Sequence, residues 1–143
     1  MIRVIADDLG TFAVKVEQLA DTDNLKPAVA KSTFSIERQA KENITANGSV
    51  KSGHLRRMIA GEVKGLTGIV HTSNVKYARW VEEGTGAHTI RPKKKKALYW
   101  AGASHPVRLV KHPGSAAKPY LIPAFEQEKP KFLQNLKEAI KWN

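Results

Sequence analysis

The chain has 143 residues, of which 41% are hydrophobic and 26% charged, with a formal net charge of +11 and no cysteine. These values are typical of one globular domain, which we expect to span residues 1–143. The lack of cysteine excludes a disulfide framework and a thiolate metal site. No apolar run approaches the roughly 20 residues of a membrane span. The opening residues do not have the pattern of a secretion signal, so we expect a cytosol-like compartment and no membrane partner.

Positive charge is concentrated in one part of the chain. Residues 84–125 carry eight Lys or Arg and no Asp or Glu, whereas residues 1–83 carry twelve against ten. Such a segment favours a polyanion or an acidic protein surface as a neighbour. A solvated basic loop that aids solubility is the alternative interpretation.

The first third of the chain is predicted to be helical. After a weak strand signal at 2–5, the apolar residues from Leu9 to Leu19 recur at helical spacing and predict a helix over about 8–20. A longer apolar stripe predicts a second helix over about 25–46. A short third helix is expected to begin at Ser52 and to turn Ile59 inward.

A hairpin and a short helix follow. Gly65 and Gly68 separate two apolar stretches and predict two paired strands. Tyr77, Trp80 and Val81 then fall at i, i+3 and i+4, on one face of a short helix. That helix is expected to end at Gly84 with a positive φ. On spacing alone, this stretch is equally well a simple amphipathic helix with a glycine cap.

Residues 86–118 contain three short strand candidates, at 88–91, 97–100 and 106–110. The apolar face of the last segment predicts a terminal helix, which Pro130 should kink or restart. Helices first, a small antiparallel sheet and a final helix define an α+β fold. Its expected parts are a helical part at 8–46, a hairpin with a short helix at 62–85, a basic excursion at 86–118 and a terminal helix at 120–143.

Signatures of catalysis are missing from the sequence. The five histidines never occur at the i, i+4 spacing of a helical metal pair, and no cluster of acidic residues accompanies them. Glu82 and Glu83 are adjacent, so on a helix they point about 100° apart and do not make a carboxylate dyad. We therefore expect no enzyme, no catalytic or metal-binding residues and no cofactor.

The basic tract offers contact with DNA or with an acidic protein partner. Four consecutive lysines precede Tyr99 and Trp100, which combines positive charge with aromatic faces. Because the aromatics lie in an apolar run, they are better interpreted as packing or subunit contacts than as base-stacking residues. The candidates for contact with DNA or an acidic partner are Arg91, Lys93, Lys94, Lys95, Lys96, Arg108 and Lys111. The candidates for packing against another subunit or partner are Leu98, Tyr99, Trp100, Val107 and Leu109.

Four separated motifs, taken in order, resemble the head–tail junction family of long-tailed bacteriophages and prophages, whose members are called tail-completion, neck or minor tail component proteins. The motifs lie at 52–56, 75–85, 112–114 and 118–125, and the resemblance covers about residues 25–143. Tyr120 replaces the usual Phe of the last motif, which keeps an aromatic side chain. The motif residues given a structural role are Ser52, Gly53, Leu55, Arg56, Tyr77, Ala78, Val81, Glu82, Gly84, Thr85, Pro119, Tyr120, Pro123 and Ala124.

The resemblance implies a non-enzymatic virion protein at the head–tail junction, assembled in the bacterial host cytoplasm. It implies a homo-oligomeric ring, a hexamer by analogy, through which DNA passes. The implied neighbours are a head-connector or head-closure protein on one side and a tail terminator or tail-tube protein on the other. Tyr77, Trp80 and Tyr120 are then expected to be packing residues where the basic excursion returns to the body. Two alternatives remain open, a tail terminator that caps the tail tube and a small basic DNA-binding protein.

Overall fold

The computed structural model describes the backbone of residues 2–7, 11–16 and 23–140, and the side chains of residues 23–140. Its larger sheet is antiparallel and has the strand order β1-β2-β4-β3. The strands are β1 (Ile2–Asp7), β2 (Thr11–Val16), β3 (Ile59–Lys64) and β4 (Thr67–Thr72). A smaller sheet pairs β5 (His88–Ile90) with β6 (Val110–His112). The helices are the 3-10 turn η1 (Asp23–Leu25), α1 (Lys26–Ala46), α2 (His54–Met58), α3 (Ala78–Glu83) and α4 (Leu121–Ile140).

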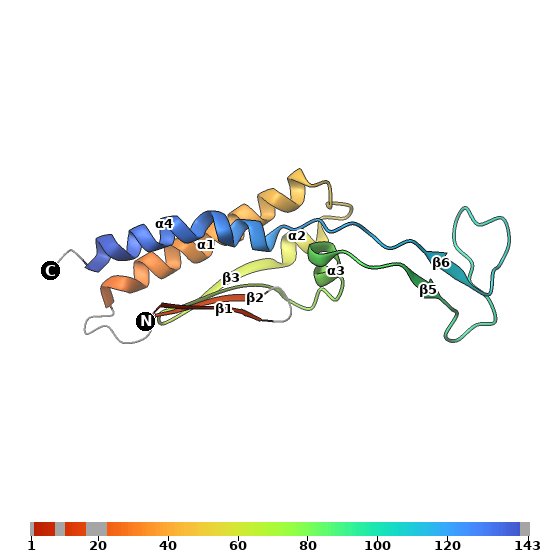
Figure 1. Ribbon diagram of the computed structural model, residues 1–143, viewed down its shortest axis with the longest axis horizontal. Coiled ribbons are helices and arrows are strands. Elements are labelled where there is room, and N and C mark those ends of the chain that lie inside the picture. The colour runs from red at the N-terminus through yellow and green to blue at the C-terminus, as the bar shows by residue number, and fades with distance from the viewer. Residues whose placement is uncertain (1, 8–10, 17–22, 141–143) are drawn as a thin grey trace.

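Helix α1 forms the centre of the molecule. Its apolar residues recur every three or four positions, and the resulting stripe faces the sheet and α4. Helix α4 lies beside α1 and runs antiparallel to it, above the larger sheet, whereas β5 and β6 project away from this body (Figure 1). The predicted helix over 25–46 and the α+β fold are both confirmed. The core residues of α1 are Ala28, Val29, Ile36, Ala40 and Ile44.

Helix α4 continues without interruption through Pro130. The expected restart of the helix at this proline is therefore wrong, whereas the alternative, a kink, stays a prediction. Proline removes only one hydrogen bond, to the carbonyl of Glu126, and burial of the apolar face on either side stabilises the helix enough to compensate. That face also carries a buried carboxylate, Glu128, whose oxygens accept hydrogen bonds from Ser32 Oγ (3.1 Å) and Ser35 Oγ (2.7 Å) of α1.

The predicted first helix over 8–20 is wrong. Within that range the described residues, 11–16, form strand β2, which lies between β1 and β4 in the sheet. Residues 8–10 and 17–20 are outside the described part of the chain. The spacing was misleading because Phe12 and Val16 fit both the helical repeat and the two-residue repeat of a strand. The alternation Phe12, Val14, Val16 and the β-branched residues favour a strand, here one that pairs along both edges.

The predicted hairpin is confirmed, but it is longer than expected. Strand β3 begins at Ile59, which was assigned to the third helix, and α2 ends at Met58. Ile59 is nevertheless turned inward, with 1% of its surface exposed. Residue Gly53, with φ of 71°, is the residue that precedes α2, and the Ser52 hydroxyl accepts a hydrogen bond from the backbone N–H of His54 (3.3 Å).

Of the three strand candidates in the basic excursion, only the first is confirmed, as β5. The second, 97–100, makes no strand and contributes a single bridge between Leu98 and Val107. The third, 106–110, is displaced, since β6 begins at Val110. These stretches are apolar enough for strands, but no sheet or helix of the described part of the chain covers them.

Candidate assembly interface: the arm and its root

The basic excursion forms an arm, defined here as residues 86–118, which leaves the body after α3 and returns before α4 (Figure 1). At its root the outgoing and returning chains are hydrogen-bonded to each other. The backbone N–H of Thr85 donates to the Ser115 carbonyl (2.9 Å), and Ser115 N–H donates back to the Thr85 carbonyl (3.0 Å). Further in, the N–H of Lys118 donates to the Val81 carbonyl (2.8 Å). The root thus holds both ends of the arm to α3.

Glycine is required on both sides of this root. Gly84 has a φ of 75°, and a Cβ at this position would lie 2.6 Å from the Ser115 carbonyl oxygen. Gly114, with a φ of 93°, would place a Cβ 2.2 Å from the Thr85 carbonyl oxygen. Real Cβ atoms do not approach backbone oxygens so closely, so the two chains can pair here only because both residues lack a side chain. The positive φ predicted for Gly84 is confirmed.

Glu82 joins the root to the terminal helix. Its buried carboxylate accepts three backbone hydrogen bonds, from the N–H groups of Tyr120 (2.8 Å), Leu121 (3.0 Å) and Ile122 (2.9 Å). These are N–H groups of the first turn of α4, which have no partner within the helix, and the helix dipole favours a negative charge there. A residue of α3 therefore caps a helix that begins 39 positions later in the chain. Sequence reasoning gave Glu82 only a motif role and missed this contact, because nothing local signals it.

Tyr120 is the packing residue of the root, as predicted. It is 2% exposed, and its carbonyl accepts a hydrogen bond from Asn43 Nδ2 of α1 (3.0 Å). Burial and the nearby Glu82 carboxylate raise the pKa of the Tyr120 phenol, although a hydrogen bond with Thr72 acts in the opposite direction. Asn47 Nδ2 donates to the Lys118 carbonyl (3.1 Å), so α1 anchors the returning chain as well.

The other residues of the last motif explain how α4 begins. Pro119 is exposed and directly precedes the capped turn. Pro123 is in the first turn, where a missing N–H costs nothing, and Ala124 is fully buried against the core. Ala78 of α3 and Leu55 of α2 are likewise buried. Leu55, Ala78 and Ala124 thus belong to the core, whereas the structural role that the resemblance implied for Pro119 and Pro123 stays a prediction.

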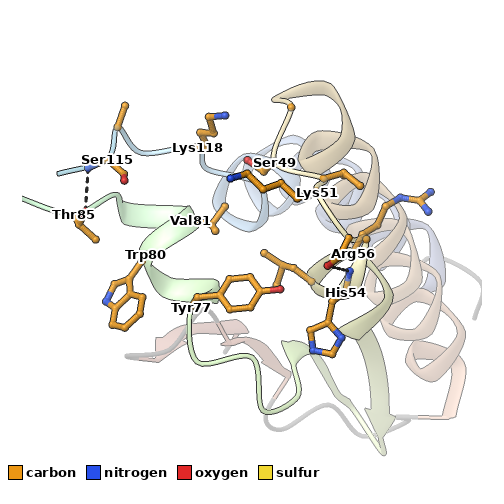
Figure 2. Close-up of a pocket in the computed structure, with 16 residues that line it drawn as sticks. Ser49, Lys51, His54, Arg56, Tyr77, Trp80, Val81, Thr85, Ser115 and Lys118 are labelled. Atoms are coloured by element: carbon orange, nitrogen blue, oxygen red, sulfur yellow. Dashed lines mark hydrogen bonds between the residues drawn. The ribbon is translucent and has the colours of Figure 1, made fainter. Parts of the chain in front are cut away.

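Tyr77 and Trp80 differ from the expectation that they are packing residues. Tyr77 is 41% exposed and Trp80 is 58% exposed. With Val81 they line one side of a groove, whose other side is the segment 48–56 (Figure 2). Arg56 is exposed at the edge of this groove, where its Nε donates to the Lys41 carbonyl (3.4 Å). The helical spacing predicted Tyr77, Trp80 and Val81 on one face, but only Val81 packs against the core, and the two aromatic side chains are exposed.

The arm has no core of its own. Not one residue from 86 to 118 is buried. The β5–β6 pair is reinforced by stacking of His88 on His112, with ring centroids 4.9 Å apart. His112 Nδ1 also accepts the backbone N–H of Gly114 (3.0 Å), which shapes the turn before the root. Beyond β5 and β6, Leu98 and Val107 exchange two backbone hydrogen bonds, of 2.7 and 3.0 Å.

The residues proposed for partner contact lie in this arm. Tyr99 is 69% exposed, Trp100 is 49% exposed and Leu109 is 37% exposed, while Leu98 and Val107 are half-buried. The seven proposed basic contact residues are all exposed, and they occur with no acidic residue in the arm. They are Arg91, Lys93, Lys94, Lys95, Lys96, Arg108 and Lys111. The arm therefore presents large apolar side chains and positive charge on the same projecting segment.

Among the described residues, no group of three or more His, Cys, Asp or Glu side chains is arranged to hold a metal ion. The helices of the described part include none that is both long and apolar enough to cross a membrane. The prominent features of the described structure are an α+β body and a basic, aromatic arm fixed at a glycine-dependent root, which together are typical of an assembly protein.

The chain belongs to a family of phage tail components. The sequence profile of the family described as "Bacteriophage HK97-gp10, putative tail-component" matches residues 7–84, more than half of the chain. The match begins in β1 and ends at Gly84, so it includes the Tyr77 motif and stops where the arm begins. The match confirms the family that the sequence motifs suggested. The matched segment, residues 7–84, starts and ends earlier than the expected coverage of about residues 25–143. No curated protein and no solved structure matches the chain.

Proposed function

We propose that this phage tail component is a structural, non-enzymatic subunit of the head–tail junction, and that it assembles through its arm into a homo-oligomeric ring. The supporting observation is the exposure of Tyr99 and Trp100 at 69% and 49% on an arm without a core. Large aromatics on a projecting segment are typical of a surface that is covered in an assembly.

The position of the arm supports the proposed ring. The arm projects from one end of an elongated body (Figure 1), and contact between the arm of one copy and the body of the next would involve two different surfaces. Such heterologous contacts close into a ring when the rotation between copies divides a full turn. By analogy with the family, we propose that the ring is a hexamer. The body of each copy would then form the ring and the arm would bridge to its neighbour.

The charge of the arm supports a place beside DNA. All eight Lys and Arg residues of the arm are free of acidic neighbours within it, and a channel lined by such residues attracts the phosphate backbone without reading its sequence. In this proposal DNA passes through the lumen. A head-connector or head-closure protein binds one side of the ring and a tail terminator or tail-tube protein binds the other, in a virion assembled in the bacterial host cytoplasm.

Two alternatives make different predictions. A tail terminator of similar size and architecture would bind tail-tube subunits and not head-connector subunits. A small basic DNA-binding protein would stay monomeric and bind duplex DNA with an affinity that falls steeply with salt. The exposed lysines 93–96 are the observation in favour of the latter.

The test is the mass of the full chain in solution, measured by light scattering at two protein and two salt concentrations. The chain is expected to form a ring-sized species, and the double substitution Tyr99→Ser with Trp100→Ser is expected to leave a monomer. Phe34→Ser is the matched control, because Phe34 is 53% exposed on α1, outside the arm. A monomer that stays monomeric with connector and tail-tube proteins added would refute the ring. A ring that survives the arm substitutions would refute the role of the arm.

A further inference from the structure

A groove lies at the base of the arm, lined by residues of the body and by the returning end of the arm. Its volume is about 600 Å³, and it lies between α3 and the segment that links α1 to α2. Figure 2 shows Tyr77, Trp80 and Val81 on the α3 side and Ser49, Lys51 and His54 on the opposite side. The arm root, at Thr85 and Ser115, closes one end. The groove is therefore built by three separate parts of the chain around the same root.

The large apolar side chains that line the groove are exposed to solvent. Trp80 is 58% exposed, Tyr77 is 41% exposed and Val50 is 40% exposed, although all three line one cavity. Aromatic residues of this kind, next to a cavity and not covered by their own chain, are the usual anchors of protein interfaces. Among the described residues, the buried Ser49 Oγ in this lining has no hydrogen-bond partner.

The charged side chains that line the groove are all positive. Lys51, Arg56 and Lys118 line it, and no carboxylate belongs to its lining. The two carboxylates of α3 are engaged elsewhere, Glu82 in the cap of α4 and Glu83 in an ion pair with Arg79 (2.8 Å). Among the described residues, neither Lys51 nor Lys118 forms an ion pair. The groove thus offers an apolar floor and unpaired positive charge at its rim.

We propose that this groove binds an acidic segment of a neighbouring virion protein, with an aromatic or large aliphatic side chain inserted against Trp80 and Tyr77. Charge complementarity selects this occupant. The arm of a second copy is apolar enough to enter, but it carries eight cations and no anion, so the Lys51 and Lys118 charges repel it. This inference rests on the proposed function for the existence of such a neighbour, and it names the chemistry by which the neighbour is recognised.

The test uses four ten-residue peptides and the full-length, ¹⁵N-labelled chain. The peptides alternate Glu with Leu and Phe, Glu with Ala, Lys with Leu and Phe, or Lys with Ala. We expect the acidic aromatic peptide alone to shift the NMR signals of residues 48–56 and of the Trp80 indole. Trp80→Ala should weaken its binding at least about tenfold, which is the usual cost of losing an aromatic anchor. Lys51→Glu should weaken the acidic aromatic peptide and strengthen the basic aromatic one.

Matched controls lie outside the groove. Trp100→Ala removes an exposed tryptophan of the arm, and Lys76→Glu reverses an exposed charge next to Tyr77 that is not part of the lining. Both should leave peptide binding within about twofold of the unaltered chain. The inference is overturned if none of the four peptides shifts the groove signals, or if the basic aromatic peptide binds as tightly as the acidic one. It is also overturned if Trp100→Ala weakens binding as much as Trp80→Ala.

Light scattering on the same samples separates this inference from the proposed ring. If Trp80→Ala no longer formed a ring, a second copy would be the occupant of the groove. That result would overturn the inference, but it would agree with the proposed ring of the unaltered chain. A chain that never forms a ring but binds the acidic aromatic peptide would refute the proposed function and support the groove. Stronger displacement of the groove signals by an oligothymidine than by the peptide would identify the site as a nucleic-acid site and overturn the inference.

Discussion

Substitution of Glu82 by Gln tests whether the α3 carboxylate is what stabilises the start of α4. The carboxylate accepts hydrogen bonds of 2.8, 3.0 and 2.9 Å in a site where Glu82 is 7% exposed. A hydrogen bond to a charged group contributes about 1.5–3 kcal/mol, and an unsatisfied buried donor costs a similar amount. Gln keeps one oxygen acceptor but turns an NH₂ group toward N–H donors. We therefore expect Glu82→Gln to lower the free energy of unfolding by about 2 kcal/mol and Glu82→Ala by about 4 kcal/mol.

The matched control is Glu83→Gln, because Glu83 is adjacent, exposed and paired with Arg79. An exposed ion pair contributes about 0.2–1 kcal/mol, so this change should be small. Urea unfolding followed by far-UV circular dichroism gives the free energies, and amide hydrogen exchange gives a local readout. Exchange at Tyr120, Leu121 and Ile122 should accelerate in Glu82→Gln and not in the control. Equal stability of the two Gln variants, with unchanged exchange at these three amides, would refute the capping argument.

Three further predictions follow from the same structure. Gly84→Ala should lower the free energy of unfolding in urea by roughly 2 kcal/mol or more, because Gly84 has a positive φ and lies close to the Ser115 oxygen. Gly86→Ala should lower it much less, because no atom lies within 4 Å of the added Cβ. Glu128→Ala should cost about 2 kcal/mol by removing the buried acceptor between α1 and α4, while the exposed Glu126→Ala should be nearly neutral in the same assay. The pKa of Tyr120 is raised above the ordinary 10.0, so the contribution of this phenol to stability is complete below that pH and declines as the pH rises beyond it. The midpoint of urea unfolding should therefore fall more between about pH 9 and about pH 11 in the unaltered chain than in Tyr120→Phe.

The parts of the fold that could be predicted from sequence are those in which one long signal dominates. The stripe of α1 extends over six turns, and no competing period fits it, so the helix over 25–46 was predicted within a residue or so. Gly84 was predicted to have a positive φ for a local reason, the end of a helix, and this also holds. By contrast, the segment 11–16 is short enough to fit both periods, and its strand conformation depends on pairing with β4, more than fifty residues away.

The site illustrates a second limit. The exposure of Tyr77 and Trp80 depends on what the rest of the chain leaves uncovered, and no spacing rule reports that. The cap provided by Glu82 joins residues 39 positions apart, so only the folded chain reveals it. The basic tract was easier to find, because charge composition is a property of the segment itself and exposure of such residues is the normal case.

The root explains how an arm without a core can still transmit binding energy to the body. The outgoing chain is held by Thr85 and Ser115, the returning chain by Val81 and Lys118, and the first turn of α4 by Glu82. The orientation of the arm at its base is thus determined before any partner arrives. Binding then has to order only the part beyond β5 and β6, which lowers the conformational entropy lost on association. A partner that moved the base of the arm would have to break the root hydrogen bonds or uncap α4, so in the proposed assembly a contact at Tyr99 and Trp100 would act on the α1–α4 core through the root.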